Sequence, residues 1–242
     1  MISKTLPPLD GLPVGVHPLV KKLMSACYNL NPPKPRYEST WDTDVVIRFV
    51  KESDEDVGLS LATLSQKTVT LLALASFLRV GELASIDFRS VAFSDGRVRF
   101  SLLNARKAQH DGPLQSFVLE ELPDEKSCPV RALRAYVDRT AVRRNGVNIN
   151  SLFISLRSPF AAVKPSSISR WIKTFLTAAG VDTSVFGAHS TRGAGASKAT
   201  ANGVSIDSVL RAGHWAREST FRRFYHREVE PSVASEVSRQ RT

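Results

Sequence analysis

The sequence has 242 residues, of which 42% are hydrophobic and 23% charged, and these proportions are normal for globular proteins. They exclude a wholly disordered, collagen-like or repeat-only chain, and the length fits one large domain, or one domain with a fragment, at roughly 150 residues per domain. The longest apolar candidate, residues 69–78, is too short for a membrane span, and the N-terminus lacks a signal-peptide pattern. We therefore expect an intracellular protein without a membrane partner.

The charge of the chain is unbalanced. There are 33 Lys and Arg residues against 23 Asp and Glu, a formal net charge of +10, and most of the excess lies in residues 101–242. Such a balance favours a polyanionic partner, and nucleic acid is the leading class. The two cysteines, Cys27 and Cys128, are too few for a disulfide framework and are not spaced as zinc ligands, so we expect neither a metal nor another cofactor.

The N-terminal residues 1–37 are rich in proline, which predicts a tail, a short helix over 18–28 and an extended linker. Residues 38–230 form the predicted domain, and residues 231–242 a C-terminal tail. Hydrophobic spacing and the start and stop signals predict helices, the first capped by Ser39 or Thr40, over 40–52, 59–78, 128–143, 166–179, 190–202, 205–212 and 219–227. The helix over 59–78 is almost wholly apolar from Val69, so we expect it in the core.

A small sheet is predicted in the middle of the chain. Strand-like runs at 91–93 and 97–102 flank the turn signal Ser94-Asp95-Gly96, and a third strand at 114–119 could complete an antiparallel sheet. Lys107 would lie in the connection before the third strand. The predicted fold class is α+β, mainly α-helical, with a small three-stranded antiparallel sheet.

Candidate functional residues begin at the end of the apolar helix. Arg79 follows about ten mostly apolar positions, and Glu82, three residues on, could orient its guanidinium. The alternative is a helix-terminal arginine that reaches solvent. Further on, His189 and Arg192 stand three residues apart at a predicted helix start, a geometry that suits a phosphate, although capping or a surface position would also explain them.

Aromatic residues mark the last part of the chain. Gly213-His214-Trp215 follows a short predicted helix, and Phe221, Phe224 and Tyr225 then share one helical face. Taken alone, this spacing is typical of a core aromatic stripe.

Taken in order, these five boxes resemble the tyrosine recombinase (phage integrase) family: Leu-Arg-Val-Gly-Glu-Leu, a lysine after a hairpin, His-x-x-Arg, Gly-His-Trp and a final tyrosine. The resemblance covers about residues 38–230 and implies the DNA breaking-rejoining catalytic fold. Residues 128–133 and 219–225 look most like recombinases of eukaryotic DIRS-like mobile elements, which implies a nuclear location for such an element. Relatives place a helical DNA-clamping domain before the catalytic one, so residues 1–37 are interpreted as a remnant of it.

The resemblance implies a role for each matching position. Arg79 and Arg192 would bind the scissile phosphate, Tyr225 would attack it to leave a 3′-phosphotyrosyl bond, and Lys107 would protonate the departing oxygen. His189 would assist as a base or phosphate contact, and Glu82 would support Arg79. The implied activity is metal-independent DNA strand cleavage and rejoining in recombination or integration. The implied partners are double-stranded DNA and further copies of the chain, as a dimer or tetramer.

Two assignments stay open. His214 and Trp215 precede Tyr225 by eleven and ten residues, whereas the family's donor position precedes its tyrosine by about nine. Both side chains can donate an N–H to phosphate, and both are candidates. Arg106 adjoins Lys107, but a general acid must release its proton, which favours the lysine.

Three other functions compete with strand transfer. A metal-dependent nuclease could use Asp42, Asp44 and the acidic run 52–56. A DNA-binding or domesticated recombinase domain would lack strand-transfer activity. A type IB topoisomerase would relax DNA with similar tyrosine chemistry.

Overall fold

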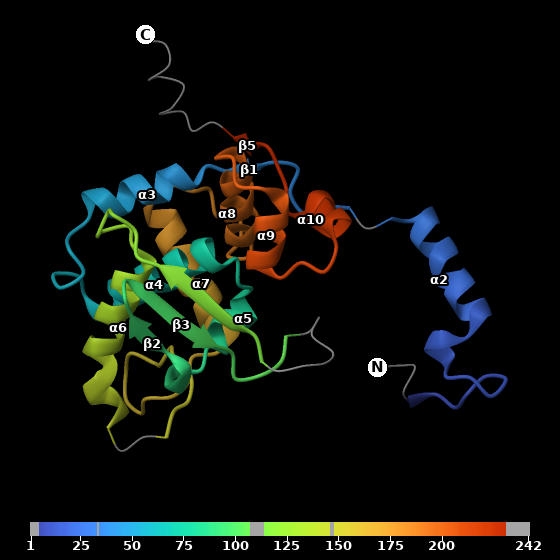
Figure 1. The fold of residues 1–242 in the computed structure, drawn as a ribbon, viewed down its shortest axis with the longest axis horizontal. Helices are drawn as coiled ribbons and strands as arrows, with labels where there is room; N and C mark the ends of the chain where they lie inside the picture. Colours follow the sequence, from blue (N-terminus) through green and yellow to red (C-terminus); the bar gives the residue numbers. More distant parts are fainter. Residues whose placement is uncertain (1–4, 33, 107–113, 146–147, 231–242) are drawn as a thin grey trace, which may run out of the picture. The chain divides into compact units, whose positions relative to one another are not determined.

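The computed structural model describes residues 5–32, 34–106, 114–145 and 148–230, and the chain divides into two compact units at residues 36 and 37 (Figure 1). The first unit contains the 3-10 helix η1 (Val14–Val16) and α2 (Pro18–Leu30), which confirms the predicted short helix. The second unit contains, in chain order, β1 (Thr40–Trp41), α3 (Thr43–Glu52), α4 (Leu61–Ser76), α5 (Val80–Ala84), η2 (Phe88–Ser90), β2 (Ala92–Ser94), β3 (Arg97–Ser101), β4 (Ser116–Glu120), α6 (Pro129–Arg144), α7 (Pro165–Ala178), α8 (Ser190–Ala201), α9 (Ile206–Gly213), α10 (Glu218–Phe224) and β5 (Val229–Glu230).

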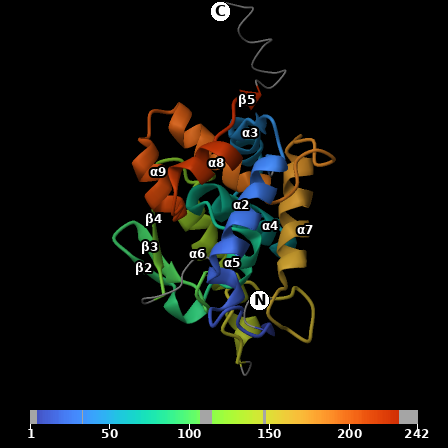
Figure 2. The same ribbon diagram turned by 90° about the vertical axis from the view of Figure 1, so that its right-hand side faces the viewer.

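Helix α4 forms the centre of the second unit. Ser60 caps its start by accepting a hydrogen bond from the N–H of Thr63 at 3.1 Å, and most of the following side chains are buried. Helices α6, α7 and α8 all pack against α4, and Figure 2 shows α7 running beside it. The predicted core helix is therefore confirmed, and its surroundings fix the position of the residues that follow its C-terminal end.

One lysine is buried within this core helix. Lys67 has a side chain that is 1% exposed, and its Nζ lies 2.6 Å from Oδ1 of Asp56. A buried ammonium without its carboxylate has neither water nor a counter-charge. We expect Asp56→Asn to lower the free energy of unfolding by about 3–5 kcal/mol, measured by urea denaturation. The matched control Asp54→Asn changes an exposed aspartate in the same loop, and equal stability of the two variants would contradict this account.

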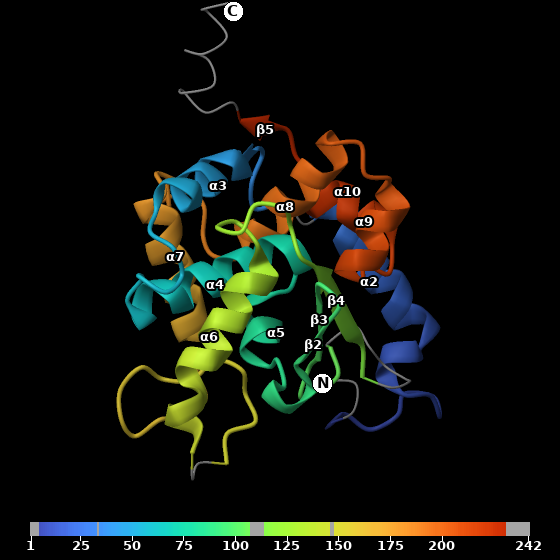
Figure 3. The same ribbon diagram turned by 60° about the vertical axis from the view of Figure 1, so that its left-hand side comes forward.

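The three strands β2, β3 and β4 form an antiparallel sheet in that order, as predicted. Asp95 and Gly96 both have positive φ, at 45° and 70°, which is the turn conformation that suits a two-residue hairpin. In β3, Val98 and Phe100 are buried, and Phe100 stacks on Phe117 of β4 with ring centroids 5.5 Å apart. This buried face extends toward α9, which Figure 3 shows close to β4.

The start of the domain differs from the prediction. Thr40 was expected to begin or cap a helix, but it belongs to β1, which pairs in parallel with β5. Asp42 caps α3 instead, since its Oδ1 accepts a hydrogen bond from the N–H of Asp44 at 3.1 Å. A two-residue strand has too few residues for an alternating pattern, so the sequence gives no signal for this pairing. The pair joins the segment after α10 to the start of the domain.

Candidate functional site

Arg79 lies in a sharp turn between α4 and α5. Helix α4 ends because Phe77 adopts a left-handed backbone conformation, with φ of 53°, and Arg79 then precedes the first turn of α5. The carboxylate of Glu82 accepts hydrogen bonds from the backbone N–H and from Nη1 of Arg79, both at 2.8 Å. The Arg79 side chain remains 36% exposed. The guanidinium is thus oriented by Glu82 while it still reaches the surface.

Arg106, which the sequence analysis set aside in favour of Lys107, binds the same carboxylate. Its Nε lies 2.8 Å from Oε1 of Glu82 and its Nη2 lies 3.2 Å from Oε2. The guanidinium also donates to the backbone oxygen of Gly213 at 3.4 Å and to Oε1 of Gln115 at 3.3 Å. Burial opposes ionisation of Glu82, but the bonds from Arg106 and the Arg79 N–H outweigh it and hold the pKa of Glu82 below its usual value.

Lys107 itself lies outside the described residues. Its immediate neighbour Arg106 has a side chain that is only 4% exposed. Arg106 stands one residue before Lys107 in the segment that follows the hairpin, and this adjacency is the signal that could have identified it. A guanidinium is unsuited to proton transfer, so the general-acid role pointed to Lys107 alone.

The start of α8 carries His189 and Arg192. His189 is the residue before the helix, and Arg192, one turn in, is completely buried. Arg192 donates from Nη1 to the backbone oxygen of Phe77 and from Nη2 to that of Gly213 at 2.8 Å. Loss of hydration, aided by the like charge of Arg79, lowers the pKa of Arg192 to about 9. This cation would gain from a bound anion.

Trp215 completes the surroundings of Arg192. Helix α9 ends at Gly213, and the chain turns back so that the Trp215 ring lies 8% exposed against the cluster. Cζ of Arg192 is 3.9 Å from the centroid of the Trp215 ring, and the rings of Trp215 and Tyr225 are 5.2 Å apart. The indole therefore packs on both the buried arginine and the tyrosine.

His214 lies beside Trp215 but packs in another environment. It has left-handed backbone geometry, with φ of 52°, and its ring meets Phe117 of β4 edge-on with centroids 5.0 Å apart. Burial, aided by the nearby positive charge of Arg106, lowers the pKa of His214. The imidazole is thus predominantly neutral at pH 7 and belongs to the side of the cluster formed by Arg106.

Tyr225 directly follows the last residue of α10, which is shorter than the predicted helix over 219–227. The N–H of Tyr225 still donates to the backbone oxygen of Phe221 at 2.8 Å, and Phe221 and Tyr225 both pack on Trp215, so these two side chains share a face as predicted. The helix ends at Phe224, and the short final turn leaves Tyr225 outside it. Its backbone oxygen accepts a hydrogen bond from Oγ of Ser197 at 3.0 Å. The Tyr225 ring lies 6.1 Å from the ring of His189 and 5.2 Å from Cζ of Arg192, measured to ring centroids. These contacts connect the tyrosine to α8 and Trp215.

Residues from separate parts of the sequence therefore meet in one cluster: Arg79, Glu82, Arg106, His189, Arg192, His214, Trp215 and Tyr225. Nε of Arg192 and Nε1 of Trp215 are buried donors that have no hydrogen-bond partner among the described residues. A pocket opens beside this cluster, and its lining includes Arg106, Arg211, His214 and Trp215. Buried cations with unused donors are suited to bind an anion such as phosphate.

Three carboxylates of the alternative nuclease hypothesis form ion pairs with lysines. Nζ of Lys198 lies 3.2 Å from Oδ1 of Asp42 and 2.6 Å from Oδ2 of Asp44, and Asp56 binds Lys67. Within the described ranges, no group of three or more His, Cys, Asp or Glu residues is arranged to hold a metal ion. Likewise, no helix in that part of the chain is both long and apolar enough to cross a membrane.

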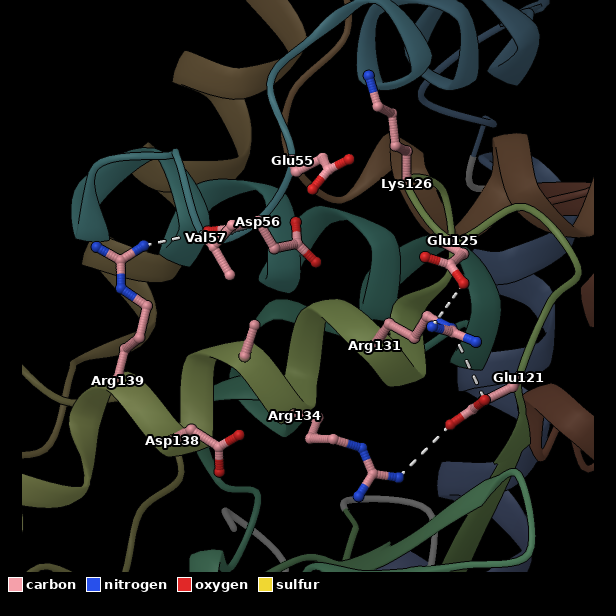
Figure 4. Close-up of a pocket in the computed structure, with 11 residues that line it drawn as sticks. Glu55, Asp56, Val57, Glu121, Glu125, Lys126, Arg131, Arg134, Asp138 and Arg139 are labelled. Atoms are coloured by element: carbon pink, nitrogen blue, oxygen red, sulfur yellow. Dashed lines mark hydrogen bonds and ion pairs between the residues drawn. The ribbon is translucent and has the colours of Figure 1, made fainter.

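A second groove lies along α6 and shares no lining residue with the cluster (Figure 4). Arg131 and Arg134 of α6 both approach Glu121, and Arg131 also lies 2.9 Å from Glu125. Arg139 donates to the backbone oxygen of Asp56 at 3.2 Å. The carboxylates that line this groove outnumber its lysine and arginine side chains by one, so the groove offers no net positive charge for an anion.

Comparison with known structures identifies the fold. The chain is similar to XerH recombinase in a post-cleavage complex with its difH substrate, with a TM-score of 0.58 and 13% identity over 76% of this chain and 48% of that one. It is also similar to XerA recombinase, with a TM-score of 0.56 and 19% identity over 92% of this chain and 73% of that one. The second unit thus has the fold of a tyrosine recombinase catalytic domain.

Comparison with protein families and sequences gives the same result. The model of the phage integrase family matches residues 40–230. A relative from Selenomonas ruminantium, an integrase/recombinase XerD homologue, is 23% identical over 165 residues, which are 68% of this chain and 48% of that protein. The chain therefore belongs to the phage integrase family, and it spans about half the length of this relative.

Proposed function

We propose that the chain cleaves and rejoins DNA strands through a covalent phosphotyrosyl intermediate. The observation that supports this proposal is the set of contacts around Tyr225, whose ring lies beside the buried Arg192, His189 and Trp215. Arg79, which Glu82 orients through an ion pair, belongs to the same cluster. Both the nucleophile and the groups that neutralise a phosphate are thus supplied at one point by one chain.

The proposed reaction exchanges one phosphorus–oxygen bond for another. Oη of Tyr225 attacks the scissile phosphorus and forms a new bond to it, and the bond from phosphorus to the 5′-oxygen breaks. The phosphate keeps its bond to the 3′-oxygen of the DNA, so the product is a 3′-phosphotyrosyl adduct. The tyrosine proton passes to His189, and Lys107 protonates the departing 5′-oxygen. Because a phosphodiester is conserved in the adduct, another strand's 5′-hydroxyl reverses the exchange without ATP.

The arginines stabilise the charge that develops on the phosphate. The pentacoordinate transition state carries more negative charge on its non-bridging oxygens than the diester does, and planar guanidinium forks match that geometry. Arg192 is already desolvated, so its attraction for those oxygens is weakly screened. No metal ion is required in this scheme.

The proposed partner is double-stranded DNA, with further copies of the chain bound to it. Support comes from the excess of positive charge in residues 101–242 and from the solved relatives. XerH was captured on a palindromic difH substrate, and a lambda integrase fragment, with a TM-score of 0.50, was solved as a dimer on a core site. Recombination or integration of a mobile element is the proposed biological context.

A covalent trapping experiment tests the chemistry without a known target site. Duplexes of randomised sequence, nicked so that a short 5′-hydroxyl fragment diffuses away, are incubated with the protein in EDTA, and covalent adducts are recovered under denaturing conditions and sequenced. Adducts are expected with the wild type. Tyr225→Phe should abolish them while DNA binding, measured by gel shift, is retained, because the phenyl ring packs but has no nucleophile.

The matched control is Tyr28→Phe, which removes a tyrosine hydroxyl from α2 and should leave adduct formation unchanged. An adduct that persists in Tyr225→Phe would assign the nucleophile to another residue. An adduct that forms only with Mg²⁺ would contradict the metal-independent mechanism.

A further inference from the structure

We propose that Arg106 is a positioning residue of the strand-cleavage reaction, which compensates the charge of Glu82 and holds Arg79 and Arg192 in register. The inference rests on the proposed function. It follows from contacts among described residues and does not depend on Lys107.

Arg79 and Arg106 together occupy both oxygens of the Glu82 carboxylate. Each oxygen of Glu82 accepts two hydrogen bonds, one from Arg79 and one from Arg106, with lengths between 2.8 and 3.2 Å. Two guanidinium ions thus share a carboxylate that is itself largely buried. Without Arg106, both oxygens would lose one of their two partners, and Arg79 would lose the fixed geometry of its support.

Arg106 and Arg192 share a second hydrogen-bond acceptor. The backbone oxygen of Gly213 accepts a bond from Nη2 of Arg192 at 2.8 Å and from Nη2 of Arg106 at 3.4 Å. Arg106 therefore contacts the supports of both proposed phosphate-binding arginines, the Glu82 carboxylate and the Gly213 carbonyl. A displacement of Arg106 would therefore shift Arg79 through Glu82 and Arg192 through the carbonyl of Gly213.

Arg106 also raises the net positive charge of the cluster. Arg79, Arg192 and the shared carboxylate of Glu82 together carry one net positive charge, and Arg106 adds a second. The phosphodiester carries one negative charge and its pentacoordinate transition state carries two, so Arg106 brings the cluster close to the charge of the transition state rather than that of the ground state.

The experiment compares rates with binding on a nicked duplex recovered by the trapping screen. Arg106→Gln is expected to slow single-turnover adduct formation by about 100-fold while the Kd for DNA changes little. Arg106→Lys should recover only part of the loss, because an ammonium restores charge but cannot grip both Glu82 oxygens. The matched control Arg89→Gln removes an exposed arginine that pairs with Asp87 and should react at the wild-type rate.

Two readouts separate this role from support of the fold. A methylphosphonate at the scissile position removes one negative charge from the transition state, so Arg106→Gln should slow that substrate by a clearly smaller factor. Adding Glu82→Gln to Arg106→Gln removes one negative charge and restores the net positive charge that the cluster has in the wild type, so the double variant should react faster than Arg106→Gln alone. A purely structural residue would affect both substrates equally and gain nothing from the second substitution.

The outcomes are distinct from those of the proposed function. If the wild type forms no adduct, strand cleavage itself is refuted. If the wild type forms the adduct and Arg106→Gln keeps its rate, or loses rate equally on both substrates, only the role of Arg106 is overturned.

Discussion

The Gly213→Ala variant is expected to lose adduct formation by about 100-fold or more and to be about 1–3 kcal/mol less stable than the wild type. A Cβ atom at this position would lie 1.8 Å from Cζ3 and 2.3 Å from Cε3 of Trp215. The indole cannot remain where it is, yet it packs on Arg192 and Tyr225. The methyl group therefore displaces the ring that contacts both the proposed nucleophile, Tyr225, and the buried cation.

Kinetics and stability can be measured separately for this variant. Single-turnover adduct formation on the trapped duplex reports the site, and urea denaturation reports the free energy of unfolding. Gly58→Ala is the matched control, because its Cβ would meet its nearest neighbours at 3.5 and 3.6 Å, which is ordinary contact. A Gly213→Ala protein that reacts at the wild-type rate would show that the position of Trp215 is unimportant.

The sequence predicted the parts of the fold that repeat a pattern. The apolar run of α4, the hairpin at Asp95-Gly96, the end of α8 shortly before Gly203 and the end of α9 at Gly213 follow from periodicity and turn chemistry. The pairing of β1 with β5 has no such pattern, because two residues do not establish an alternation. The end of α10 at Phe224 was also missed, since Tyr225 fits the helical spacing that the chain then abandons.

The sequence predicted those residues of the candidate site that belong to a motif. It did not predict the residues that join the site only through packing in the folded chain. The ordered boxes located Arg79, His189, Arg192 and the Tyr225 region, and the structure brings these residues together. The bonds from Arg106 to Glu82 were not predictable, since buried contacts between distant segments leave no spacing in the sequence. The same holds for the carbonyl of Gly213, which acts through its backbone.

The different environments of His214 and Trp215 favour Trp215 as the side chain that would donate a hydrogen bond to the phosphate. Trp215 packs on Arg192 and Tyr225, and its buried Nε1 has no partner among the described residues, whereas His214 packs against Phe117. An N–H beside the proposed nucleophile that has no partner could bind the phosphate of the proposed substrate without first breaking another hydrogen bond. His214 instead lies on the side of the cluster that Arg106 occupies.

Trp215→Phe is accordingly expected to slow adduct formation by about 100-fold, because it removes this N–H while keeping an aromatic ring in place. Trp215→Ala should in addition lower the free energy of unfolding by about 3–5 kcal/mol, since it empties a site lined by Phe77, Phe221 and Tyr225. His214→Phe, the matched control, removes the imidazole N–H and keeps an aromatic ring beside Phe117, so its rate should stay close to that of the wild type. The reverse order of the two rates would assign the donor to His214 and leave Trp215 as the packing residue that positions Arg192.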